Sequence, residues 1–188
     1  MKKYLILVKH SLPTVVESIP ASEWKLSDEG RMRAERLAEQ LRDFEPDIIV
    51  SSEESKAKET AEIISRLLQL EMQVIPDLHE HDRNNVSYLS QEQFRTSVRQ
   101  FFQTPDELVF GKETAHQAHA RFYRAVHSIL NEHRNKTVVI VAHGNVISLF
   151  VSRLTGSSDF ELWSMLGLPS FIALDLHSNT LILRDHIV

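Results

Sequence analysis

The sequence predicts an α/β protein, a three-layer sandwich in which a mostly parallel central sheet carries helices on both faces. Residues 5–8 and 137–141 are uninterrupted apolar runs rich in β-branched residues. Such runs are typical of strands buried on both faces, and these strands usually belong to parallel sheets. The segments between the apolar runs have apolar residues at helical spacing, so helices are expected to alternate with the strands.

The first half of the chain is predicted to contain three strands and two long helices. A polar, proline-interrupted loop follows the first strand as far as Trp24. A helix then begins after Ser27, whose side chain can cap it, and acidic residues occupy its first turn, where the helix dipole favours them. A second buried strand at 48–50 precedes the second helix, and a short third strand is predicted at 74–75.

The second half is predicted to continue this alternation and to end in an antiparallel hairpin. Residues 81–112 have a weaker pattern and are interpreted as an insertion that caps the site within a single domain of residues 1–188. A turn signal at 177–179 separates two apolar runs at the end of the chain. The predicted elements are helices at 91–103, 113–134 and 146–151, and hairpin strands at 171–176 and 180–183.

Composition narrows the class of protein. The 188 residues are 42% hydrophobic and 25% charged, which is ordinary for a soluble globular domain. The net charge of −5 and the lack of a basic block argue against nucleic-acid binding, and no apolar stretch is long enough to span a membrane. Without cysteine there is no disulfide and no thiolate zinc ligand. A cytoplasmic location is the default expectation.

Polar residues follow the predicted strands at the points where these strands end. Lys9 and His10 come directly after the first strand, and His143 follows the strand at 137–141. Lys56 lies about one turn into the helix after the strand at 48–50. Open α/β sheets bind their ligands at the carboxyl ends of their strands, so we expect these side chains to meet in one site.

Five short segments, taken together and in this order, resemble the histidine phosphatase superfamily, also called phosphoglycerate-mutase-like. Each segment alone is a weak signal, but the series covers most of the chain. The segments are Val-Lys-His-Ser at 8–11, Ser-Ser at 51–52 with Lys56 and Thr60-Ala61 beyond it, Leu-His-Glu at 78–80, Gly-Lys-Glu-Thr at 111–114 and Val-Ala-His-Gly at 141–144.

This resemblance implies a catalytic set for phosphoryl transfer. His10 would be the nucleophile, with a backbone carbonyl fixing the tautomer of its ring. His143 would stabilise the charge that builds on the phosphoryl oxygens. Glu80 would protonate the leaving oxygen and would therefore need a raised pKa and a partly desolvated carboxyl group. Asp77 and Asp82 are nearby rivals for this acid role, but Glu80 matches the family segment.

Lys9, Ser11, Lys56 and Gly144 would bind the phosphoryl group, and Arg83 is a candidate substrate contact. In the family, arginines stand at the positions of Lys9 and Lys56. Lysine keeps the charge but loses the planar fork that binds phosphate through two parallel hydrogen bonds, so reduced turnover is expected. Lys58 is an alternative to Lys56 on the same helix.

Further departures from the family pattern concern the residues beside these positions. Ser11 replaces a glycine, so its backbone is expected to avoid positive φ or to be strained. Glu53 and Glu54 replace a Pro-Leu pair and add negative charge near an anion site.

Histidine pairs elsewhere in the chain raise the question of a metal site. His79 and His81 are two residues apart, and His116 and His119 lie on adjacent turns of one predicted helix. Neither pair has a third ligand at a characteristic spacing, so the sequence predicts no metal site and no cofactor.

The resemblance therefore implies metal-independent hydrolysis of phosphomonoesters through a phosphohistidine on His10. The expected partner is a small phosphorylated molecule, with no nucleic acid and no membrane. One alternative is a pseudoenzyme that binds a phosphate ligand with little turnover. A phosphoglycerate-type mutase is the weaker alternative, because after the final strand there is no tail to shield a phosphoenzyme from water. The oligomeric state stays open, a homodimer included.

Overall fold

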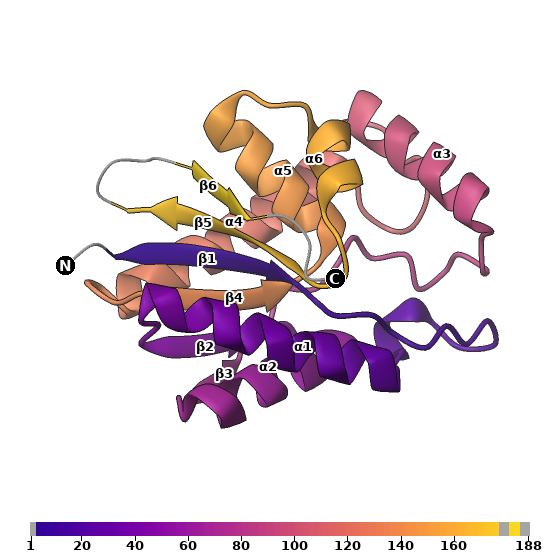
Figure 1. The fold of residues 1–188 in the computed structure, drawn as a ribbon. Helices are drawn as coiled ribbons and strands as arrows, with labels where there is room; N and C mark the ends of the chain where they lie inside the picture. The colour runs from indigo at the N-terminus through magenta and orange to yellow at the C-terminus, as the bar shows by residue number, and fades with distance from the viewer. Residues whose placement is uncertain (1–2, 177–180, 185–188) are drawn as a thin grey trace.

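The computed structural model describes residues 3–176 and 181–184 of the chain (Figure 1). Its strands are β1 (Tyr4–Lys9), β2 (Ile48–Ser51), β3 (Met72–Val74), β4 (Val138–Ala142), β5 (Ser170–Asp175) and β6 (Leu181–Arg184). Its α-helices are α1 (Asp28–Leu41), α2 (Ser55–Leu68), α3 (Gln91–Gln103), α4 (Ala115–Glu132), α5 (Gly144–Thr155) and α6 (Asp159–Met165).

The strands form a single six-stranded sheet in the order β3-β2-β4-β1-β5-β6. Strands β3, β2, β4 and β1 are parallel, whereas β5 pairs antiparallel with β1, and β6 antiparallel with β5. The predicted mostly parallel sheet is thus confirmed, as are the two strands of the terminal hairpin. The turn predicted at 177–179 lies outside the described residues.

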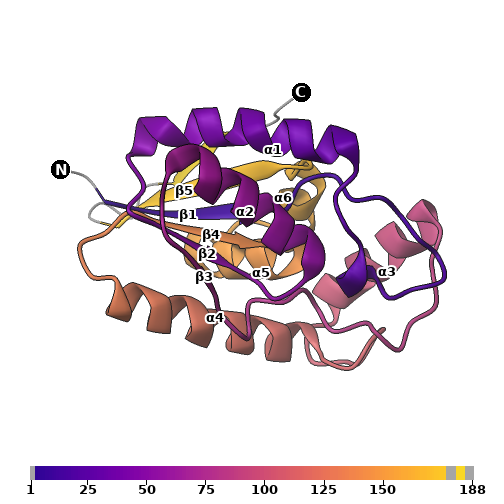
Figure 2. The same ribbon diagram turned by 90° about the horizontal axis from the view of Figure 1, so that it is seen from below.

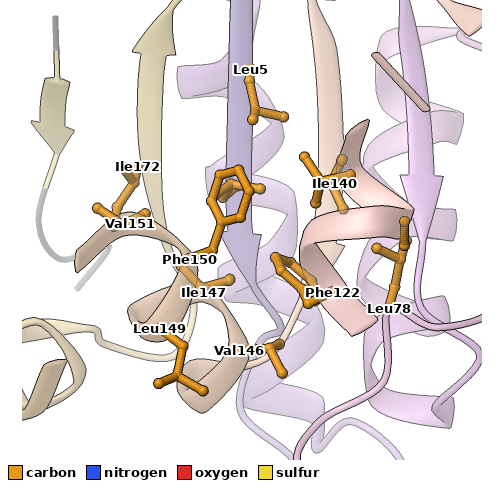
Figure 3. Close-up of a cluster of buried hydrophobic side chains, with 14 of the residues drawn as sticks. Leu5, Leu78, Phe122, Ile140, Val146, Ile147, Leu149, Phe150, Val151 and Ile172 are labelled. Carbon is orange, nitrogen blue, oxygen red and sulfur yellow. The ribbon is translucent and has the colours of Figure 1, made fainter. Parts of the chain in front are cut away.

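Helices cover both faces of the sheet, as the continuous apolar strands require. In β1, Leu5 and Leu7 belong to the core beneath α4 and α5, and Ile6 and Val8 belong to the core beneath α1 and α2. Figure 2 shows these two helix pairs on opposite sides of the strands. Figure 3 shows the first core, where Phe122 of α4 meets the apolar side chains of α5 over β1 and β4. The three-layer sandwich follows from this double burial.

The start of α1 fixes the loop that follows β1. Ser27 caps the helix as predicted, since its hydroxyl accepts a hydrogen bond of 3.0 Å from the Gly30 N–H. A side chain at Gly30 would place a Cβ 2.0 Å from the Leu12 carbonyl oxygen. Glycine therefore allows α1 to lie directly against the loop carrying His10 and Ser11.

Two parts of the fold lie beyond what periodicity predicts. Helix α6 has seven residues, which is too short for a helical repeat to stand out in the sequence. The loop after β1 contains a single 3₁₀ turn, Ala21–Glu23.

Helix α3 lies beyond the end of the sheet to which the arrows of β1 and β4 point (Figure 1).

Among the described residues, no helix combines the length and apolar character needed to cross a membrane.

Candidate active site

A cavity of about 630 Å³ opens where the chain leaves β1, β2 and β4. Its lining combines basic, acidic and aromatic side chains, the aromatic ones coming from Trp24, Phe94 and Trp163. Two predicted site residues, His143 and Ser11, are fully buried and are not part of the lining. The predicted site residues that do line the cavity are Lys9, His10, Lys56, Glu80, Arg83 and Gly144.

His10 is held in one orientation by the backbone. Its Nδ1 lies 2.8 Å from the carbonyl oxygen of Ser11, and its backbone N–H donates to the Ala142 carbonyl at 3.0 Å. A carbonyl oxygen can only accept, so Nδ1 carries the ring proton and Nε2 has a free lone pair. Burial, with help from the charge of Lys56, holds the pKa of His10 well below its usual value. The ring is therefore neutral at physiological pH.

His143 directly follows β4 and lies beside His10, with the two ring centroids 5.2 Å apart. A hydrogen bond of 2.9 Å joins His143 Nε2 to the Ser52 hydroxyl. Within the described residues, its buried Nδ1 has no hydrogen-bond partner. Burial lowers the pKa of His143 to about 3, against an opposing effect of the Glu54 carboxylate. A second neutral imidazole thus lies next to the first.

Glu80 rests on the N-terminus of α5. Its carboxyl oxygens accept hydrogen bonds from the backbone N–H groups of His81 at 3.0 Å, Asn145 at 3.1 Å and Val146 at 3.3 Å. Burial raises the pKa of Glu80, and the Glu54 carboxylate adds to this rise, whereas the N–H groups of Asn145 and His81 oppose it. The balance favours a carboxyl group that holds a proton at higher pH than an exposed one would.

Lys9 is the last residue of β1, and its side chain lies over Gly144. Lys9 Nζ donates to the Leu166 carbonyl at 2.8 Å. A Cβ at Gly144 would lie 3.3 Å from Lys9 Cε and 3.3 Å from the Trp163 ring, so glycine leaves room for both side chains. Burial lowers the pKa of Lys9 to about 8, although the charge of Glu80 favours the ammonium form.

Lys56 and Glu54 form a buried ion pair at the start of α2. The side chains are 6% and 10% exposed, and Lys56 Nζ also donates to the Ala21 carbonyl at 2.7 Å. Burial alone would raise the pKa of Glu54, but the Lys56 ammonium and the backbone N–H of Glu80 favour the ionised form and hold that pKa well below its usual range. The carboxylate is therefore ionised.

Ser11 and Arg83 occupy different surroundings. The Ser11 hydroxyl donates to the Gly30 carbonyl at 2.6 Å, and the Ser11 N–H donates to the Thr60 hydroxyl at 3.0 Å. Its φ is not positive, so the backbone avoids the glycine-only region as the sequence suggested. The Arg83 guanidinium lies 4.4 Å from the centre of the Phe94 ring at the cavity wall.

One residue of the site was missed by sequence reasoning. Arg121 of α4 is 9% exposed and donates to the carbonyls of Asp77 at 2.8 Å, His79 at 3.0 Å and Glu80 at 3.3 Å. It also pairs with the Glu113 carboxylate at 2.5 Å. Arg121 therefore holds the loop that carries Glu80. The sequence could have indicated this role, because Arg121 lies on the face of the predicted helix that carries the apolar residues.

The histidine pairs considered as metal ligands have other surroundings. His81 is 1% exposed and packs against Phe101 and Phe110, at centroid distances of 4.3 and 4.6 Å. His116 Nδ1 lies 2.6 Å from a carboxylate oxygen of Asp106. Over residues 3–176 and 181–184, no group of three or more candidate ligands is placed to hold a metal ion.

Sequence comparison relates the chain to known proteins. A profile of the histidine phosphatase superfamily (branch 1) matches residues 7–185. The chain is 32% identical over 139 residues to the uncharacterized phosphatase PhoE of Bacillus subtilis (strain 168), an alignment covering 74% of this chain and 68% of that protein. It is 29% identical over 142 residues to phosphoglycerate mutase-like protein 4 of Arabidopsis thaliana, covering 71% of this chain and 62% of that protein.

Solved structures have the same architecture. The mycobacterial glucosyl-3-phosphoglycerate phosphatase superposes with a TM-score of 0.76 at 21% identity, covering 98% of both chains. The phosphoserine phosphatase of Entamoeba histolytica, solved with 3-phosphoglyceric acid, gives a TM-score of 0.77 at 19% identity, again over 98% of both chains. At these identities the likeness shows the fold. Because the sequence profile spans nearly all of the chain, this protein belongs to the histidine phosphatase superfamily.

Proposed function

We propose that the chain hydrolyses phosphomonoesters of small molecules, without a metal ion, through a phosphohistidine formed on His10. The observation that carries this proposal is the hydrogen bond of 2.8 Å between His10 Nδ1 and the Ser11 carbonyl. It leaves Nε2 as the basic nitrogen of a neutral ring in the cavity wall. The depressed pKa of His10 keeps this nitrogen unprotonated.

The proposed reaction has two displacements at phosphorus. Nε2 of His10 attacks phosphorus, the bond to the leaving oxygen breaks, and Glu80 gives that oxygen its proton. Water then attacks the phosphohistidine, Glu80 takes a proton from it, and the P–N bond breaks to release inorganic phosphate. The raised pKa of Glu80 suits both roles.

Lys9, Lys56 and His143 would stabilise the negative charge on the phosphoryl oxygens. The ammonium groups of Lys9 and Lys56 line the cavity, and the His143 ring lies beside His10. Gly144, which has no side chain, would allow the phosphoryl group to approach its backbone closely in the same cavity. Because neither lysine offers a bidentate fork, we expect lower turnover than arginine would give at these positions.

The substrate class and the cap are part of the same proposal. Solved relatives are named for glucosyl-3-phosphoglycerate and phosphoserine, which supports a small phosphorylated substrate here too. Residues 81–112 would cap the site within a single domain, since Arg83 and Phe94 from this segment line the cavity. Arg83 would then contact the organic part of the substrate.

The test is phosphate release from an aryl phosphate in EDTA, with His10→Ala measured in parallel. We expect turnover by the wild-type protein, none above background by His10→Ala, and an acid-labile phosphoenzyme in the wild type alone. Turnover that survives His10→Ala would refute the phosphohistidine mechanism. Phosphate binding by both proteins without turnover by either would instead identify a pseudoenzyme.

A further inference from the structure

Glu54 places an ionised carboxylate among the groups that would bind the phosphoryl group. Oε2 contacts Lys56 Nζ, and Oε1 lies 3.6 Å from His143 Nε2. Oε1 also accepts a hydrogen bond of 2.8 Å from the backbone N–H of Glu80. The side chain lines the cavity together with His10. A carboxylate thus already occupies the surroundings that an anionic ligand requires.

The contacts of Glu54 are those that a phosphoryl oxygen would take. A phosphomonoester carries close to two negative charges at neutral pH, and it needs uncompensated donors near His10. The charge of Lys56 is matched by Glu54, which lies in the same poorly solvated pocket. Like charges in such a pocket repel strongly because little water screens them. The phosphoryl group and the carboxylate therefore cannot both keep these contacts.

We propose that Glu54 is an affinity-determining residue, whose carboxylate competes with the phosphoryl group for Lys56 and His143 and must turn away when a phosphate ligand binds. This inference rests on the proposed function, because it assumes that the phosphoryl group binds beside His10. One consequence is weak retention of inorganic phosphate. The product would leave readily, since Glu54 returns to Lys56 as phosphate departs.

The experiment compares Glu54→Gln with Glu53→Gln by titrating each protein with inorganic phosphate in a calorimeter at constant ionic strength. Glutamine keeps the shape of the side chain while removing its charge. Glu53 is an exposed neighbour in the same cavity wall, so its variant loses the same charge where solvent screens it. We expect Glu54→Gln to bind phosphate about tenfold more tightly or better, and Glu53→Gln to change the affinity by less than about threefold.

The same variants separate this competition from a structural role. We expect the KM for an aryl phosphate to fall in Glu54→Gln, whereas a loosened site would raise it. Unchanged or weaker phosphate binding, or equal gains in both variants, would overturn the inference. A crystal structure of the wild-type protein with phosphate needs no variant, and phosphate bound while Glu54 still contacts Lys56 would also overturn it. The His10→Ala turnover assay tests the proposed function independently, because it does not depend on these affinity ratios.

Discussion

Lys9 is a cation of the site whose charge changes within the accessible pH range. Burial brings its pKa to about 8, so the free protein loses this charge as pH rises through that value. Phosphoryl binding should weaken over the same range, because the ammonium form attracts the anion and the amine does not. We therefore predict that kcat/KM, which reports groups of the free enzyme, falls above about pH 8. An aryl phosphate is the right substrate, since its good leaving group makes the acid form of Glu80 dispensable.

The control for this pH dependence is Lys9→Arg. A guanidinium stays charged throughout the accessible range, so the alkaline fall should disappear. The same variant restores a planar fork at this position, and a rise in kcat near neutral pH would support the expected weakness of lysine there. An alkaline fall that persists unchanged in Lys9→Arg would show that another group titrates.

Arg121 links the helix α4 to the loop that carries the proposed acid. Its guanidinium donates to three carbonyls of this loop region and to Glu113, whose Oε1 in turn accepts from the Asp82 N–H at 3.0 Å. We predict that Arg121→Met lowers the free energy of unfolding by about 3 to 5 kcal/mol, because Glu113 is left as a buried unpaired carboxylate. Denaturant titration measures this change.

The kinetic effect of Arg121→Met should depend on the leaving group. A displaced Glu80 would slow hydrolysis of alkyl phosphates, which need an acid, more than hydrolysis of aryl phosphates. Arg124→Met is the matched control, since Arg124 is an exposed residue on the same helix. Equal losses for both classes of substrate would mean that Arg121 stabilises the fold without positioning Glu80.

The elements most visible in the sequence were those with a long buried face. Strands β1, β2 and β4 each contain an uninterrupted apolar run, and this pattern predicted the sheet directly. Contacts between distant segments left no such pattern. Glu54 was recognised as added negative charge near an anion site, but its ion pair with Lys56 depends on how α2 begins against the loop after β1. Arg121 was hidden because a single arginine on a helix is usually solvated.

At the scale of the whole molecule, the site joins segments that lie far apart in the chain. His10 follows β1, Lys56 lies in the first turn of α2, Glu80 follows β3 and His143 follows β4. These segments are held together by the two hydrophobic cores, which pack on opposite faces of the sheet. A ligand that contacts all four side chains can therefore bind only the folded chain. Anion binding and global stability are therefore linked by mass action.

This linkage predicts that inorganic phosphate raises the melting temperature in a saturable way. At a hundredfold excess over its dissociation constant, a ligand adds about 2.7 kcal/mol of stability. For a protein of this size that corresponds to roughly 5 to 10 °C.

Lys9→Met should lose most of the shift, because it removes a buried cation of the cavity while keeping the length of the side chain. Lys58→Met removes the same charge outside the cavity lining and should keep it. Differential scanning calorimetry in phosphate, with chloride at equal ionic strength as reference, makes the comparison. Equal shifts in the two variants would mean that phosphate stabilises the chain somewhere other than beside His10.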